Sequence, residues 1–238
     1  MKKFFSKRVM IWGAVVVAGV CALALIIPSV FRTADIRQMA LDNIAEARFF
    51  MKQGATTSFR VQFSSGVREN PYAQDGRANA TVPFALVYLE PIGSSMSAYD
   101  TLGGTLRLGD EELAFNMERA QFRPQNFAHD IERLVERGTD VVLILNLTTG
   151  NVTIPLQDAM SAEGAIGWEE ALDIVVAEME EEIRALGEFE TYVRIITDRN
   201  HSAAYWSIQF LNRNAQTVFA VLTNSGEIIG RSNSSPAG

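Results

Sequence analysis

An uncharged apolar stretch near the amino terminus constrains this chain most. Residues 9–31 read VMIWGAVVVAGVCALALIIPSVF and carry no charged side chain. A helix of about 23 residues is roughly 34 Å long, which is enough to cross a hydrocarbon core of about 30 Å. Three lysines and one arginine precede it within residues 1–8, and such a positive flank stays in the cytoplasm. The sequence therefore predicts a cytoplasmic tail (1–8), a transmembrane signal-anchor helix (9–31) and a single-pass protein of the cell membrane, with its C-terminal domain extracytoplasmic.

The same stretch has two alternative interpretations. A cleaved secretory signal has an apolar region of about 7–15 residues followed by a small-residue cleavage site. This stretch is longer, and the residues 32–35 that follow it, RTAD, make a poor cleavage site. A lipoprotein signal would modify Cys21, but Val20 suits the position before a lipidated cysteine poorly. We expect the anchor to remain uncleaved and to contact the lipid bilayer through residues 9–31.

Composition excludes several classes of protein. The chain of 238 residues has a net charge of −7 and an isoelectric point near 5.0, which argues against nucleic acid as a partner. One cysteine excludes a disulfide scaffold and a multi-cysteine zinc site, and two histidines make a histidine-rich metal centre unfavourable. The 47% hydrophobic content is typical of a folded domain with a core.

Periodic patterns beyond residue 32 predict an α+β fold. Apolar residues recur at helical spacing over 35–52, 126–137 and 168–186, and short alternating or apolar runs between and after them indicate strands. A polar stretch over 64–79 is typical of a long exposed loop. We expect an N-terminal transmembrane helix, then antiparallel sheets with helices packed on one face, in a first unit (32–156) and a second unit (157–238). The predicted strands cover 57–65, 80–90, 105–108, 112–117, 140–146, 151–156, 189–197, 205–211, 216–223 and 227–229.

The last third of the chain resembles a PepSY domain, an extracytoplasmic module of cystatin-like, helix-on-sheet shape. The resemblance rests on WEEAL (168–172) at a helix start, YWSIQF (205–210) as a strand, and VFAVLTNSGEII (218–229) as a closing strand, turn and strand. Thr223 and Ser225 stand where that family's turn usually has an acid and a threonine. The resemblance covers about 60 residues, and it implies a binding or inhibitory module without catalytic residues.

No group of residues in the sequence forms a recognisable catalytic, cofactor or metal motif. Cys21 lies in the predicted span, and no Gly-x-Ser-x-Gly pattern is present. His129 and His201 lie in polar surroundings that favour solvation, and the acidic run 178–182 lacks a calcium-loop pattern. The glycines of 103–109 lack the lysine and helix of a phosphate-binding loop. We therefore predict no catalytic, cofactor-binding or metal-binding residues, although 28 acids leave carboxylate pairs open.

Two aromatic residues are the remaining candidates. Tyr205 and Trp206 alternate on one predicted strand, so one is exposed if the other is buried, and an exposed aromatic on a sheet edge could bind a peptide by strand addition. Core packing is the alternative for each. We expect a non-catalytic, membrane-anchored binding, regulatory or scaffolding protein of the cell envelope, with a protein or peptide partner. The alternatives are an anchored hydrolase with an unrecognised carboxylate site and an assembly subunit of a trans-envelope complex.

Overall fold

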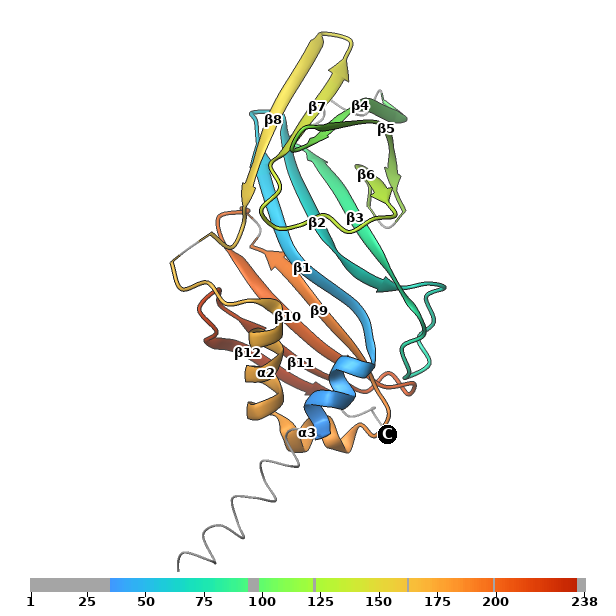
Figure 1. Cartoon of the computed structure of the whole chain (residues 1–238), viewed down its shortest axis with the longest axis vertical. Coiled ribbons are helices and arrows are strands. Elements are labelled where there is room, and N and C mark those ends of the chain that lie inside the picture. Colours follow the sequence, from blue (N-terminus) through green and yellow to red (C-terminus); the bar gives the residue numbers. More distant parts are fainter. Residues whose placement is uncertain (1–34, 94–98, 122, 162, 199, 235–238) are drawn as a thin grey trace, which may run out of the picture.

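The chain forms a mostly β structure. A computed structural model describes residues 35–93, 99–121, 123–161, 163–198 and 200–234 (Figure 1). Strands make up 55% of the structure and helices 13%. Within the described residues, twelve strands belong to one hydrogen-bonded sheet whose order is β12-β11-β10-β9-β1-β2-β3-β6-β5-β4-β7-β8.

Eight of these strands close into an antiparallel barrel. The ring closes because β8 pairs back with β1, where Lys52 lies opposite Asp158 and Gln53 lies opposite Gln157. Around the ring the strands are β1 (Ile44–Ala55), β2 (Phe59–Glu69), β3 (Thr81–Pro91), β6 (Arg123–Ile131), β5 (Glu111–Ala120), β4 (Thr101–Leu108), β7 (Val141–Leu147) and β8 (Gly150–Asp158).

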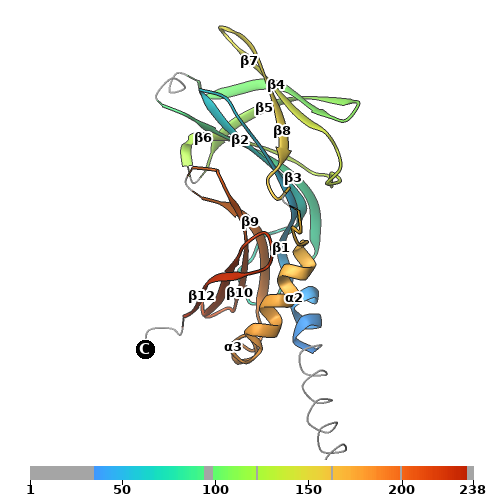
Figure 2. The same cartoon turned by 90° about the vertical axis from the view of Figure 1, so that its left-hand side faces the viewer.

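The first half of β1 extends the sheet in the other direction. It pairs in parallel with β9 (Glu190–Thr197), ending where Ala47 lies opposite Val193. β10 (Ala204–Leu211), β11 (Thr217–Leu222) and β12 (Ile228–Ser234) continue the sheet as antiparallel neighbours. A helix over 35–42, α2 (Trp168–Glu178) and α3 (Glu180–Ala185) lie on one side of this part (Figures 1 and 2).

Two main hydrophobic cores hold the structure together. The barrel interior is filled by side chains such as Phe59, Phe63 and Phe127. The second core lies between the helices and β9–β11 and includes Leu172 and Trp206. Each large apolar side chain that is fully buried contributes about 1.5–3 kcal/mol relative to exposure.

The loop between β2 and β3 is tied down by two buried carboxylates. Glu69 accepts hydrogen bonds from the main-chain N–H groups of Ala73 and Asn79, at 3.1 and 2.6 Å. Glu190, at the start of β9, accepts from the N–H groups of Asp75 and Gly76, at 2.8 and 2.7 Å. The loop is thus shorter than the polar stretch predicted from the sequence. Its hydrogen bonds to Glu190 attach the barrel to the second part of the sheet.

The α+β prediction is wrong, because two segments predicted as helices form strands. The helix expected over 35–52 ends at residue 42, and β1 follows. A bulge between Arg48 and Phe50 shifts the register of β1 by one residue, so its buried positions imitate helical spacing. The first half of the helix expected over 126–137 belongs to β6, whose Phe127 enters the barrel core while Leu134 beyond it is exposed.

Several local predictions are confirmed. The strand predicted over 57–65 is found as β2, which begins at Phe59, and Gly109-Asp110 joins β4 to β5, with Gly109 at a φ of 60°. The third helix begins at Trp168 as expected, but it is interrupted at Met179, whose φ of −129° separates α2 from α3. All four strands expected after it are present as β9–β12.

The prediction of a single-pass membrane protein is corrected as well. The tail (1–8) and the predicted transmembrane helix (9–31) lie outside the described residues. Among the residues that the structure does describe, every helix is too short or too polar to cross a bilayer. The membrane location rested on a spanning helix that the structure does not show, so it is not carried further.

Candidate functional site

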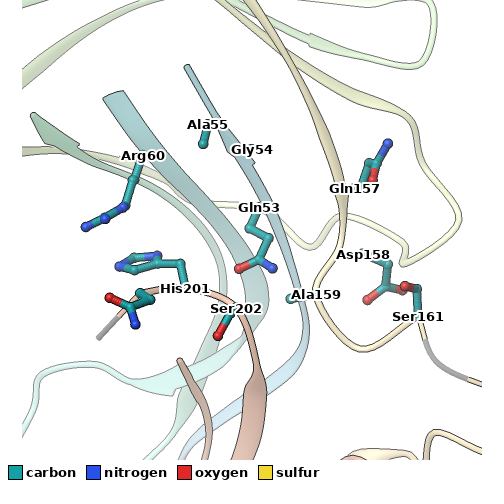
Figure 3. Close-up of a pocket in the computed structure, with 11 residues that line it drawn as sticks. Gln53, Gly54, Ala55, Arg60, Gln157, Asp158, Ala159, Ser161, His201 and Ser202 are labelled. Atoms are coloured by element: carbon teal, nitrogen blue, oxygen red, sulfur yellow. The ribbon is translucent and has the colours of Figure 1, made fainter. Parts of the chain in front are cut away.

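A cleft lies where β9 and β1 separate. The two strands pair only as far as Ala47 and Val193, whereas β8 joins β1 only from Lys52 onward. The opening has a volume of about 410 Å³ and lies on the outer side of the barrel wall. Its lining comes from β1, β2, the end of β8 with the residues after it, and the β9–β10 turn: Gln53, Gly54, Ala55, Arg60, Gln157, Asp158, Ala159, Ser161, Asn200, His201 and Ser202 (Figure 3).

Three glutamines lie side by side across β2, β1 and β8, and two of them, Gln53 and Gln157, line this cleft. Gln62 is the cross-strand partner of Gln53, and Gln53 is the partner of Gln157. Directly opposed side chains have Cβ atoms about 4.5–5.5 Å apart, so the three amides form a glutamine row. The Gln53 Oε1 atom is buried without a hydrogen-bond partner. Figure 3 shows the Gln53 side chain between His201 on one wall and Asp158 on the other.

The β9–β10 turn that forms one wall is held by Asp198. Its carboxylate accepts hydrogen bonds from the N–H and hydroxyl groups of Ser202, at 2.6 and 2.8 Å, and from the N–H of Ala203 at 2.9 Å. The bonds from Ala203 and Ser202 lower the pKa of Asp198 to about 2. The turn also needs a left-handed backbone at His201, whose φ is 57°.

His201 fastens this turn to the barrel. Its Nε2 lies 3.2 Å from Oε2 of Glu90 on β3, and its Nδ1 lies 3.3 Å from Nε2 of Gln62 on β2. Gln62 also donates to the Thr197 hydroxyl at 3.0 Å. Both ring nitrogens are therefore used by the protein itself.

The other charged side chains of the cleft are also paired. Nη1 of Arg60 lies 3.8 Å from Oε1 of Glu90, and Nε of Arg137 lies 2.7 Å from Oδ2 of Asp158. Asp158 Oδ1 additionally accepts from the N–H of Met160 at 3.1 Å. The cleft thus combines paired charges with the neutral amides of Gln53, Gln157 and Asn200.

An ion pair below the cleft joins β9 to β1. Nε of Arg194 donates to Oε2 of Glu46 at 2.7 Å, and Nε of Arg48 donates to Oε1 of Glu46 at 2.7 Å. Burial alone would raise the pKa of Glu46, but Arg48 and Arg194 hold it below the ordinary value. This pair fixes β9 against β1 immediately before the strands diverge.

The structure separates the two aromatic residues predicted for partner binding. Trp206 is 1% exposed and packs in the core beside the helices. Tyr205 is half-buried on the opposite face, across from Ile196, which is 39% exposed. Their strand, β10, lies between β9 and β11, so the free edge of the described sheet belongs to β12 instead.

Sequence reasoning missed the residues of the cleft. His201 was expected to be solvated, but its ring contacts Glu90 and Gln62. Gln53 directly follows the helix predicted over 35–52, where no strand was expected. Among the described residues no cluster of three or more His, Cys, Asp or Glu side chains could hold a metal ion.

Comparison with family models, curated proteins and solved structures gives no match to this chain. The resemblance of the last third to a PepSY domain therefore stays a prediction.

Proposed function

We propose that this chain is a non-catalytic binding protein, with a regulatory or scaffolding role, that holds a protein partner at the cleft between the barrel and the β9–β10 turn. One observation carries the proposal. Each ionisable side chain that lines the cleft lies within 4 Å of Glu90 or Arg137, whereas the Gln53 carbonyl has no partner. Such a surface offers hydrogen bonds to a ligand but no free acid or base for chemistry.

The arrangement argues against the alternative of a carboxylate hydrolase. General acid catalysis needs a carboxyl group whose pKa is raised towards the working pH, and the pKa of Asp198 is lowered instead. Glu90 and Asp158 are engaged by His201 and Arg137. Both ring nitrogens of His201 are occupied by contacts with Glu90 and Gln62.

The position of the cleft also favours binding. Its volume of about 410 Å³ falls in the range of ligand sites, roughly 300–1,000 Å³. Its walls come from segments far apart in the chain and are fixed by side-chain bonds, so the surface exists before a partner arrives. Such preorganisation reduces the ordering cost of association.

Photo-crosslinking in the full-length protein tests this proposal. A photoreactive amino acid replaces Ala55 or Asn200, two exposed residues that line the cleft. The control replaces Glu112, an exposed residue on β5, which lies four strands from β1 around the ring.

When the variants are expressed in the source cells, we expect both cleft positions to crosslink to the same protein. The purified partner should then give the same adduct with the purified variants. Position 112 gives none. Equal labelling from all three positions, or no adduct from the cleft, contradicts the proposal.

A further inference from the structure

We infer that the partner enters the cleft as an extended peptide segment whose main-chain amides hydrogen-bond Gln53 and Gln157 of the glutamine row. This inference rests on the proposed function and specifies what the cleft recognises. Its starting point is Gln53, which lines the cleft and whose Oε1 atom is buried and has no donor. A buried carbonyl without a donor is costly, and a ligand N–H would remove that cost.

A peptide group matches a glutamine side chain chemically. The N–H and C=O of one residue in an extended chain point to the same side, so the N–H can donate to a glutamine carbonyl while the C=O accepts from the glutamine amide nitrogen. In the row, Gln157 is exposed and Gln53 is half-buried beside it. Neutral amides hold a neutral main chain without the desolvation cost of an unpaired charge.

The spacing of the row suits an extended chain. Alternate residues of a strand present their N–H groups on one edge about 6.6–6.8 Å apart. The Cβ atoms of opposed residues in the row are about 4.5–5.5 Å apart. The difference of about 1–2 Å is within reach of flexible glutamine side chains. Ala55 and Ala159, which have small side chains, leave room along the base.

The lining disfavours other ligand classes. The eleven residues around the cleft include no Phe, Tyr or Trp on which a sugar or a nucleobase could stack. Arg60 is near Glu90, so the cleft does not present an uncompensated positive charge to a phosphate. Main-chain recognition also predicts tolerance of the peptide sequence, because the bonds do not read side chains.

The test uses the purified full-length chain and an array of acetylated, amidated hexapeptides, with maltohexaose as the saccharide probe. The best peptide is measured by isothermal titration, and then each of its main-chain nitrogens is methylated in turn. We expect methylation at one or two alternate positions to weaken binding about tenfold or more, since a hydrogen bond to a buried acceptor is lost.

Gln53→Met is the decisive variant because it removes the unpartnered carbonyl at similar volume. We expect it to weaken the peptide about tenfold and to leave the unfolding midpoint unchanged or raised. A peptide that is methylated at one of the sensitive nitrogens should bind Gln53→Met at least as tightly as it binds the unaltered protein. Gln209→Met, a half-buried glutamine on β10, is the matched control and should change neither property.

Three results overturn the inference. They are affinity that depends on peptide side chains but not on N-methylation, binding of maltohexaose in place of peptides, and no binding of any peptide. If peptides fail while crosslinks persist at positions 55 and 200, the partner binds as a folded surface and the proposed function stands. If the crosslinks are absent too, the proposed function fails with the inference.

Discussion

Replacing Glu190 should loosen the connection between the barrel and the second part of the sheet. The side chain is 0% exposed. Oε1 accepts from the N–H groups of Asp75 and Gly76, at 2.8 and 2.7 Å, and Oε2 accepts from the Tyr192 hydroxyl at 2.5 Å. In Glu190→Ala these three donors lose their acceptor together.

The magnitude follows from these donors. Each buried donor left unpaired costs about 1–3 kcal/mol, and water partly replaces the bond to the half-exposed Asp75 amide. We therefore expect a loss of about 3–5 kcal/mol in the free energy of unfolding. For a chain of this size that corresponds to a fall of roughly 6–20 °C in the melting temperature.

Denaturant unfolding and amide hydrogen exchange measure this effect. The Asp75 and Gly76 amides should exchange faster in Glu190→Ala. Glu188→Ala is the control, because Glu188 pairs with Arg77 on an exposed surface and should cost less than about 1 kcal/mol. The reasoning is refuted if Glu190→Ala costs no more than Glu188→Ala and exchange at both amides is unchanged.

Two further changes test the fold. A Cβ atom at Gly66 would lie 1.8 Å from the carbonyl oxygen of Ala47, so Gly66→Ala should lower the free energy of unfolding in denaturant by about 1–3 kcal/mol. A Cβ atom at Gly138 would have nothing within 4 Å, so Gly138→Ala is the control and should cost little. Equal effects of the two changes would contradict the β1–β2 register. Burial and the hydrogen bond to Glu190 raise the pKa of Tyr192 above 10.0. The stabilisation that the protonated hydroxyl gives to the folded state is therefore complete below pH 10 and is lost as the pH rises further. Above pH 10 the free energy of unfolding should fall more steeply for the unaltered protein than for Tyr192→Phe. Parallel curves for the two proteins would refute this.

Local patterns in the sequence were sufficient for many elements. Alternation of Phe59, Val61 and Phe63 predicts β2, and the glycine at position 109 predicts the β4–β5 turn, because both signals depend only on near neighbours. The strand pairing of β1 could not be read in this way. Its bulge at Arg48 and its partners on two sides are set by tertiary contacts, which override helical spacing.

The candidate site was beyond the reach of sequence patterns for the same reason. Gln53 and Gln157 meet only because β8 closes the barrel over two residue pairs. His201 reaches Glu90 only through a left-handed turn held by Asp198. Alternation correctly places Tyr205 and Trp206 on opposite faces, but it does not say which face the helices cover.

The most direct test of the account is a crystal structure of the full-length protein with the best-binding hexapeptide. The account predicts an extended peptide in the cleft with a main-chain N–H within hydrogen-bond distance of the Gln53 carbonyl. A peptide bound elsewhere, or one whose side chains alone contact Gln53 and Gln157, would contradict it.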